Sequence, residues 1–223
     1  MSYEGNANTA GVRAVLTLVV SLIVSGEAGA IGKFRATPAE LRLLPAYCAP
    51  RAQPWGNDSS RPEVRRWFQV FGKDYVHMHH YCLAMLKLRR APMIADARER
   101  RAAYVVARNN LLYMEKNVSR GFLLWPELKV LLAEAYRGLG DRARAVAAAQ
   151  QALALKPDYA RAAAFLADEW VEMGRPEEAR RVLEGAIKRG ARARSLARRL
   201  ACLEGRGRRC PAGYRSNGSR GGR

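Results

Sequence analysis

The clearest pattern of apolar and polar positions runs from Pro126 to Ala191, where one arrangement occurs twice at an offset of 34 residues. Small side chains allow two antiparallel helices to cross closely, and a large aromatic side chain can fill the gap to the next unit. Each copy also has a glycine of the kind that ends a helix in the left-handed conformation. The pattern therefore predicts two helical hairpins. The matching positions are Ala133, Tyr136, Gly140, Ala145, Ala149 and Ala152 in the first copy, and Ala167, Trp170, Gly174, Ala179, Leu183 and Ala186 in the second.

This pattern resembles the tetratricopeptide repeat, a helix–turn–helix unit with a period of 34 residues. The proline that follows the second helix in that family is Pro157 in the first copy, and Ala191 takes its place in the second. One repeat cannot bury its apolar face alone, so further helices are expected on both sides. We therefore expect an all-α fold, in which antiparallel helical hairpins stack as a short solenoid like that of the tetratricopeptide family.

Helical patterns flank the repeats. Capping signatures predict short helices that begin after Thr37 and after Ser60, and Gly72 is expected to end the second. Apolar spacing predicts longer helices over 75–90 and 98–116, which pair as a degenerate hairpin. The inner side of the helix over 98–116 is expected to carry Ala102, Val105, Val106, Asn109, Leu112 and Tyr113.

The N-terminal residues have the features of a secretory signal peptide. A polar start ends at Arg13, an apolar run extends from Ala14 to Val24, and small residues follow at Ala28 to Ala30. The alternative is a membrane anchor, but the run is shorter than the roughly 20 apolar residues that a span needs. We expect cleavage after Ala30 and an exported protein, periplasmic or secreted.

The predicted organisation has five parts. They are a signal peptide over 1–30, a loop-rich helical N-terminal segment over 31–72, a degenerate helical hairpin and connector over 73–125, repeats with a capping helix over 126–204, and a disordered basic tail over 205–223.

Export changes the interpretation of the four cysteines. An oxidising compartment favours two disulfides over metal ligands or nucleophiles. Sequence order favours Cys48 with Cys82, which would pin the N-terminal segment to a helix, and Cys202 with Cys210, which would fold the start of the tail onto the last helix. The alternative is that Cys82 and Cys202 stay reduced as small core residues.

Composition fits a folded core, because 49% of the 223 residues are hydrophobic. The net charge of +19 is unusual and favours an anionic partner. From Gly205 the chain is rich in Gly, Arg and Ser and has no acidic residue, so this tail is expected to be disordered. Its arginines could contact an anionic polymer or membrane surface, or could act only to solubilise the chain. No specific nucleic acid is expected.

The sequence has no catalytic constellation. It lacks a phosphate-binding glycine loop, a Gly-x-Ser-x-Gly turn and a His-Glu-x-x-His pair, so we expect neither an enzyme nor a cofactor. His77, His79 and His80 cannot converge on one ion from a straight helix. We expect His79 to be a hydrogen-bonded core residue. The alternative is a metal-binding or redox carrier or sensor that uses His77, His80 and possibly Cys82. His77 and His80 could supply two metal ligands, but the sequence nominates no third from elsewhere in the chain.

The family resemblance implies a concave groove lined by the first helix of each hairpin. Glu134 and Asp168 lie where the family's chaperone adaptors place asparagines, and they would repel a partner carboxylate. The resemblance, and a weaker likeness to exported bacterial repeat proteins, implies an adaptor that binds a protein segment carrying Lys, Arg or backbone donors, in envelope assembly, secretion or polysaccharide machinery. The groove positions are Glu127, Val130, Glu134, Arg137, Arg161, Ala164, Asp168, Val171 and Glu172.

Overall fold

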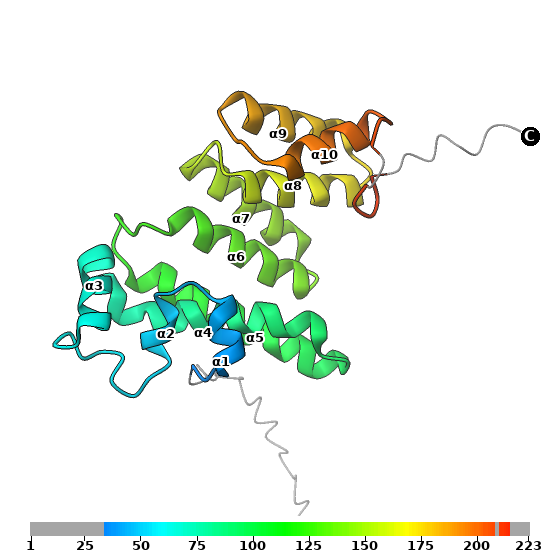
Figure 1. The fold of residues 1–223 in the computed structure, drawn as a ribbon. Coiled ribbons are helices and arrows are strands. Elements are labelled where there is room, and N and C mark those ends of the chain that lie inside the picture. Colours follow the sequence, from blue (N-terminus) through cyan, green and yellow to red (C-terminus); the bar gives the residue numbers. More distant parts are fainter. Residues whose placement is uncertain (1–33, 208–209, 215–223) are drawn as a thin grey trace, which may run out of the picture.

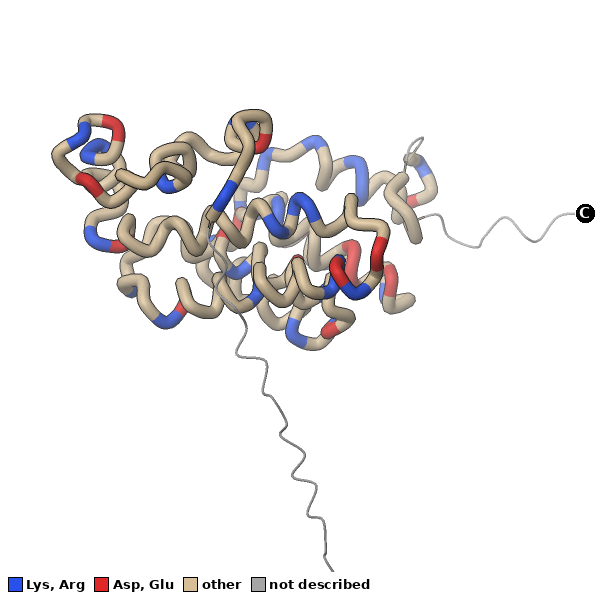
Figure 2. Tube along the Cα trace, turned by 90° about the horizontal axis from the view of Figure 1, so that it is seen from below, with Lys and Arg blue, Asp and Glu red and all other residues tan. Residues whose placement is uncertain are grey.

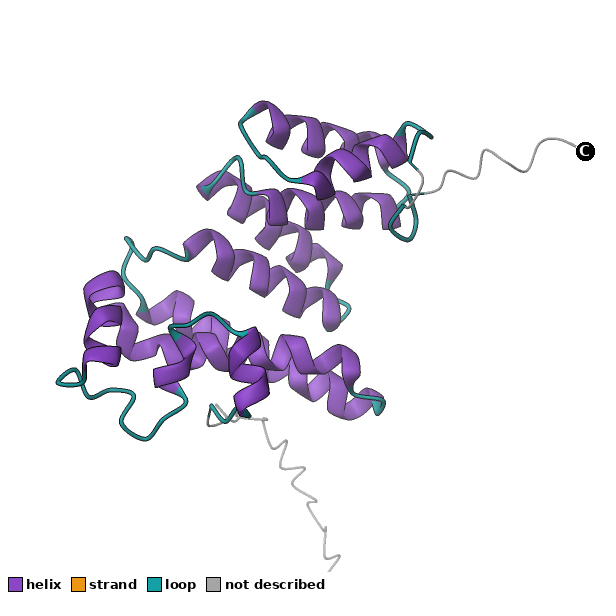
Figure 3. Cartoon of the chain, viewed as in Figure 1, coloured by secondary structure: helices purple, strands orange, loops and turns teal. Residues whose placement is uncertain are grey.

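The computed structural model describes residues 34–207 and 210–214, and the predicted signal peptide lies outside these ranges. Helices joined by loops and turns form the described chain, and no strand occurs within it (Figure 3). Helical hairpins stack one after another along the sequence (Figure 1). The helices are α1 (Pro38–Leu43), α2 (Cys48–Arg51), α3 (Pro62–Phe71), η1 (Gly72–His77), α4 (Met78–Arg90), η2 (Ala91–Met93), α5 (Ala97–Asn117), α6 (Trp125–Gly138), α7 (Arg142–Leu155), α8 (Ala160–Glu172), α9 (Pro176–Lys188) and α10 (Arg194–Leu203).

The two predicted hairpins are α6 with α7 and α8 with α9. The alanines of the repeat pattern are buried at the helix crossings, so neighbouring backbones approach closely. Gly140 and Gly174 follow the first helix of each hairpin with φ of 80° and 72°, in the left-handed region that favours glycine. The pattern of small residues and glycines therefore predicted both hairpins correctly, and the all-α stacked fold is confirmed.

The hairpin of α4 and α5 precedes the repeats, but its predicted inner face was wrong. Ala102 and Leu112 are exposed, and the buried residues lie one position later along the chain. The reason is that α5 packs against both α4 and α6, and this double contact turns its buried face by about 100° from the predicted one. The residues of α5 that are buried are Ala103, Ala107, Asn110, Leu111 and Met114.

The N-terminal segment is folded onto α4. Thr37 and Glu40 form the predicted capping box of α1, and Glu40 also accepts hydrogen bonds from Arg90 Nε and Nη2 at 2.6 and 2.8 Å. The predicted cap at Ser60 was wrong, because α3 begins at Pro62 with no side-chain cap. The Ser60 hydroxyl instead donates to Asp58 Oδ1 within its own loop.

Both predicted disulfides are formed, and each attaches a terminal segment to the stack. Cys48 in α2 is bonded to Cys82 in α4, and Cys202 in α10 is bonded to Cys210. Beyond the second disulfide, Tyr214 is only 3% exposed, so this part of the predicted disordered tail is packed. No helix among the described residues has both the length and the apolar content needed to cross a bilayer.

The disulfide between Cys48 and Cys82 is expected to be the more stabilising of the two. Replacing both cysteines by serine should lower the free energy of unfolding by about 3 to 4 kcal/mol, because a closed loop with a separation of 34 residues no longer restricts the unfolded chain. The matched control is Cys202→Ser with Cys210→Ser, whose separation of 8 residues predicts a smaller loss of about 2 to 3 kcal/mol. Urea unfolding without reductant measures both, and an equal or larger loss in the control would contradict this ranking.

Candidate protein-binding site

The helices α4, α6, α8 and α10 form one side of the stack, which is where the family resemblance predicts the groove. Successive helices of this set contact one another, and Figure 1 shows α6, α8 and α10 following one another on that side. The groove positions predicted from the family resemblance come from α6 and α8. We call this side the concave side, in keeping with the tetratricopeptide family.

The acidic groove positions are already paired with arginines of the same chain. Arg161 in α8 donates to Glu134 Oε1 at 2.8 Å and to Glu127 Oε1 at 3.4 Å, and both glutamates belong to α6. Asp168 accepts from Arg199 of α10 through Nε and Nη2, each at 2.7 Å. The expected row of acceptors is therefore corrected: each of these carboxylates already contacts an arginine of the same chain, and Glu127 and Glu134 share one.

The remaining groove positions differ in their access to solvent. Val130 is fully buried against Ala152 and Ala162, because α6 is covered by both α7 and α8, so it cannot contact a partner. Ala164 and Val171 are half-buried and pack in the cluster that includes α10. The exposed positions are Arg137, whose guanidinium stacks 4.5 Å from the Phe165 ring centroid, and Glu172, which pairs with Arg142 at 2.7 Å.

One buried carboxylate was missed as a site residue. Glu169 is fully buried, 3.6 Å from Arg137 Nη1 and 3.3 Å from Arg142 Nε, and neither of its oxygens has a hydrogen bond within the described residues. Burial raises the pKa of its carboxyl, and the two arginines oppose this effect. In the sequence, Glu169 stands one helical turn after Phe165 on the apolar face of α8, and this position could have predicted its burial. Glu169 ties the end of α6 and the start of α7 to the next hairpin.

A hollow of about 170 Å³ opens on the concave side, where three successive units meet. We call it the concave hollow. Met85, Leu88 and Leu131 are its apolar residues from α4 and α6, and the cluster around Arg161 forms one wall. Arg89 stands at its edge, exposed, and it has no ion pair within the part of the chain that the structure describes. The residues that line the hollow are Pro45, Met85, Leu88, Arg89, Glu127, Leu131, Glu134 and Arg161.

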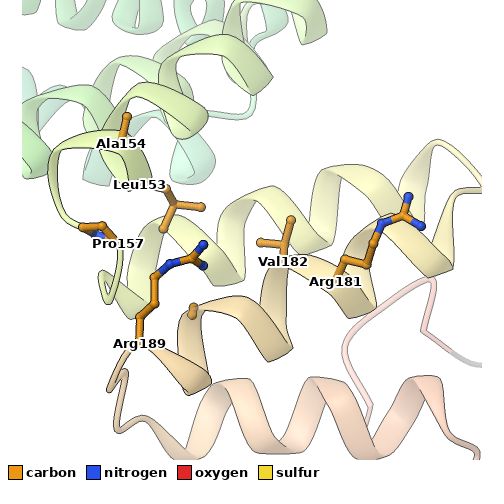
Figure 4. Close-up of a pocket in the computed structure, with 7 residues that line it drawn as sticks. Leu153, Ala154, Pro157, Arg181, Val182 and Arg189 are labelled. Atoms are coloured by element: carbon orange, nitrogen blue, oxygen red, sulfur yellow. The ribbon is translucent and has the colours of Figure 1, made fainter.

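A larger cleft of about 470 Å³ lies on the other side, between the end of α7 and α9. We call it the outer cleft. Figure 4 shows Arg189 and Pro157 at one end, Arg181 at the other, and Leu153 and Val182 between them. Arg181 belongs to α9 and Arg189 directly follows it, so this cleft offers an apolar strip between two positive charges.

The three histidines form a contact chain instead of a metal site. His80 is buried and its Nδ1 donates to Asn110 Oδ1 at 2.7 Å, so His80 is the core histidine. His79 is hydrogen-bonded as predicted but only half-buried, because α5 packs on the side of α4 that carries His80. His77 contacts the Tyr113 hydroxyl at 3.2 Å. Cys82 is bonded to Cys48, and no group of three possible metal ligands occurs among the described residues.

Arg51 fixes His79 at the start of α4. Its guanidinium is buried and donates to Val76 O at 2.7 Å and to His79 Nδ1 at 2.8 Å. Burial, with His80 and Arg51 nearby, lowers the pKa of His79 to about 4. His79 is therefore neutral at neutral pH, as an acceptor from Arg51 must be.

Comparison with protein families supports the repeat assignment. Residues 136–201 match the family model described as tetratricopeptide repeat, which spans the end of α6 to α10. Neither curated proteins nor solved structures gave a significant match. Residues 136–201 are thus similar to tetratricopeptide repeats, which generally mediate protein–protein interaction.

Stability is expected to fall in mild acid because of His79. The unfolded chain takes up a proton near pH 6.5 but the folded chain only near pH 4, so the stabilisation is complete above pH 6.5 and is lost as pH falls to 4. The loss from this residue should be about 1 to 2 kcal/mol, reduced from the full shift because the ring is partly exposed. Urea unfolding from pH 4 to 8 measures it. His79→Asn keeps an acceptor for Arg51 without titrating, and an unchanged pH slope in this variant would contradict the assignment.

Proposed function

We propose that this chain is an exported scaffold that binds a partner protein at the concave hollow. The family match to a repeat that mediates protein–protein interaction supports the class of function. The observation that carries the choice of site is that three successive hairpins, together with Pro45 of the N-terminal segment, contribute both apolar side chains and a charged wall to one hollow. Repeat proteins use surfaces built in this way for binding.

Charge pairing changes the expected partner. Glu127 and Glu134 share Arg161, so a basic partner segment would have to displace an existing ion cluster. Arg89 is the exposed charge that stays available at the hollow. Met85, Leu88 and Leu131 are only 6, 9 and 2% exposed, so the partner's apolar side chain meets a small apolar surface at the bottom of the hollow, and its polar groups meet the arginine at the edge.

Export is supported by two independent features. The sequence carries the pattern of a cleavable signal peptide, and all four cysteines are disulfide-bonded, as in proteins of oxidising compartments. Envelope assembly, secretion or polysaccharide machinery is the setting that the likeness to exported repeat proteins favours.

Binding of an anionic polymer is the second candidate. Arg181 and Arg189 flank the outer cleft, and Arg189 has no ion pair within the described residues. However, Lys and Arg are spread along the whole described chain and alternate with acidic residues (Figure 2). A charge distributed in this way favours weak, salt-sensitive contact over one defined binding track.

The proposed site predicts where a partner can be cross-linked in the native host. A photo-cross-linking amino acid in place of Arg161, in the wall of the concave hollow, is expected to capture one protein reproducibly. The same amino acid in place of Leu155, which is exposed at the end of α7, is the matched control and should not capture it. Mass spectrometry of the products makes the comparison. Equal capture from both positions, or capture from position 155 alone, would rule out the concave hollow.

Export predicts the start of the mature chain. Protein recovered from its host should begin at Ile31, because the signal-peptide pattern ends with Ala30. N-terminal sequencing of the periplasmic or secreted fraction measures this, and thiol labelling without reductant should find no free cysteine. A chain that keeps Met1 and reacts as a thiol would exclude export.

A further inference from the structure

A second hollow, of about 350 Å³, adjoins the concave hollow at the end of α4. We call it the apolar hollow. Apolar side chains from α1, α4, η2 and the following residue line it, and two of them are unusually accessible: Leu43 is 62% exposed and Met93 is 86% exposed. The lining residues are Glu40, Leu43, Leu86, Arg89, Arg90, Met93 and Ile94.

The walls of the apolar hollow are held in place. The bidentate contact of Arg90 with Glu40 joins α4 to α1, and it lowers the pKa of Glu40 to about 2, so the pair stays charged at neutral pH. The disulfide between Cys48 and Cys82 holds the next turn of the segment. On the other side, Arg100 Nη1 donates to Ile94 O at 2.8 Å. Leu43 is therefore exposed on a fixed helix, not on a free end.

Single exposed apolar residues are common on protein surfaces and need no explanation. Leu43 and Met93 differ, because they come from separate elements and line the same hollow. Leu123 is also 65% exposed, but it lines none of the hollows described above. Clustered apolar exposure of this kind marks a site of interaction.

The rim of the apolar hollow is positively charged. Glu40 is the only carboxylate among its lining residues, and it already forms an ion pair with Arg90. Arg89 lines both the apolar hollow and the concave hollow, and no carboxylate pairs with it within the described residues. A carboxylate beside an apolar side chain would therefore find an exposed guanidinium without an ion-pair partner among the described residues, at the boundary between the two hollows.

We propose that the two hollows form one docking track for a partner segment in which bulky apolar residues flank an acidic residue. One apolar side chain enters the apolar hollow beside Met93, the carboxylate binds Arg89, and the next apolar side chain reaches the concave hollow. This inference rests on the proposed scaffold function and adds the chemistry of the partner. It also assigns a role to α1, which closes one side of the track.

Labelled peptides test the track on the full chain. The probe is a pool of short fluorescent peptides in which Leu or Phe alternates with Asp, and a matched pool has Lys in place of Asp. Fluorescence anisotropy is expected to show binding of the Asp pool, with affinity about tenfold weaker for Met93→Asp and for Arg89→Glu, since truncating a central contact typically costs that much. Matched controls are Leu123→Asp and Arg181→Glu, which change exposed residues elsewhere and should leave the affinity unchanged.

Several outcomes would overturn the track. They are equal binding of the Lys and Asp pools, no binding of either, unchanged affinity in Met93→Asp, or a wild-type dimer that Met93→Asp dissociates in sedimentation, which would make a second copy the occupant. Circular dichroism and urea midpoints confirm that the variants fold. If cross-linking from position 161 still captures a partner while the peptides fail, only the track is wrong. If both fail, the scaffold function fails as well.

Discussion

Close packing of alanine-lined helices is the constraint on which the structure depends. Ala133 and Ala145 bring α6 and α7 together, and Ala167 and Ala179 do the same for α8 and α9. A hairpin of this kind leaves an apolar face on each side, so further helices must pack against both ends of a stack of two. The hairpin of α4 and α5 covers one end and α10 covers the other. Each disulfide then fastens a short terminal segment to the helix that covers its end.

These covers also determine which part of the concave side can bind. At the C-terminal end, Arg199 of α10 forms an ion pair with Asp168, and Tyr214 is buried nearby. The chain itself therefore fills this part of the groove. In the middle, Arg161 joins α6 to α8 through two glutamates. Access remains near α4, where Arg89 lies between two hollows. The proposed binding chemistry has thereby moved from acceptors toward an apolar surface with a positive charge.

The N-terminal segment connects oxidation state with this surface. α1 buries none of its residues, and the segment is held by the Glu40–Arg90 pair, the buried Arg51 and the bond between Cys48 and Cys82. Loss of that bond would loosen a wall of the track as well as lower global stability. Stability and the proposed binding surface therefore share one covalent link, which fits the export proposed above.

The sequence by itself determined the hairpins, their turns and the cysteine pairs, because these follow from helical periodicity, from the conformations open to glycine and from chain order. Only the tertiary structure decided which helices pack against two neighbours. This packing placed His80 and not His79 in the core, and it changed which face of α5 is buried. It also decided that the groove charges are paired, since Arg161 meets Glu134 across 27 residues and Arg199 meets Asp168 across 31. Long side chains find such partners only when distant helices are brought together, and no local pattern encodes that distance.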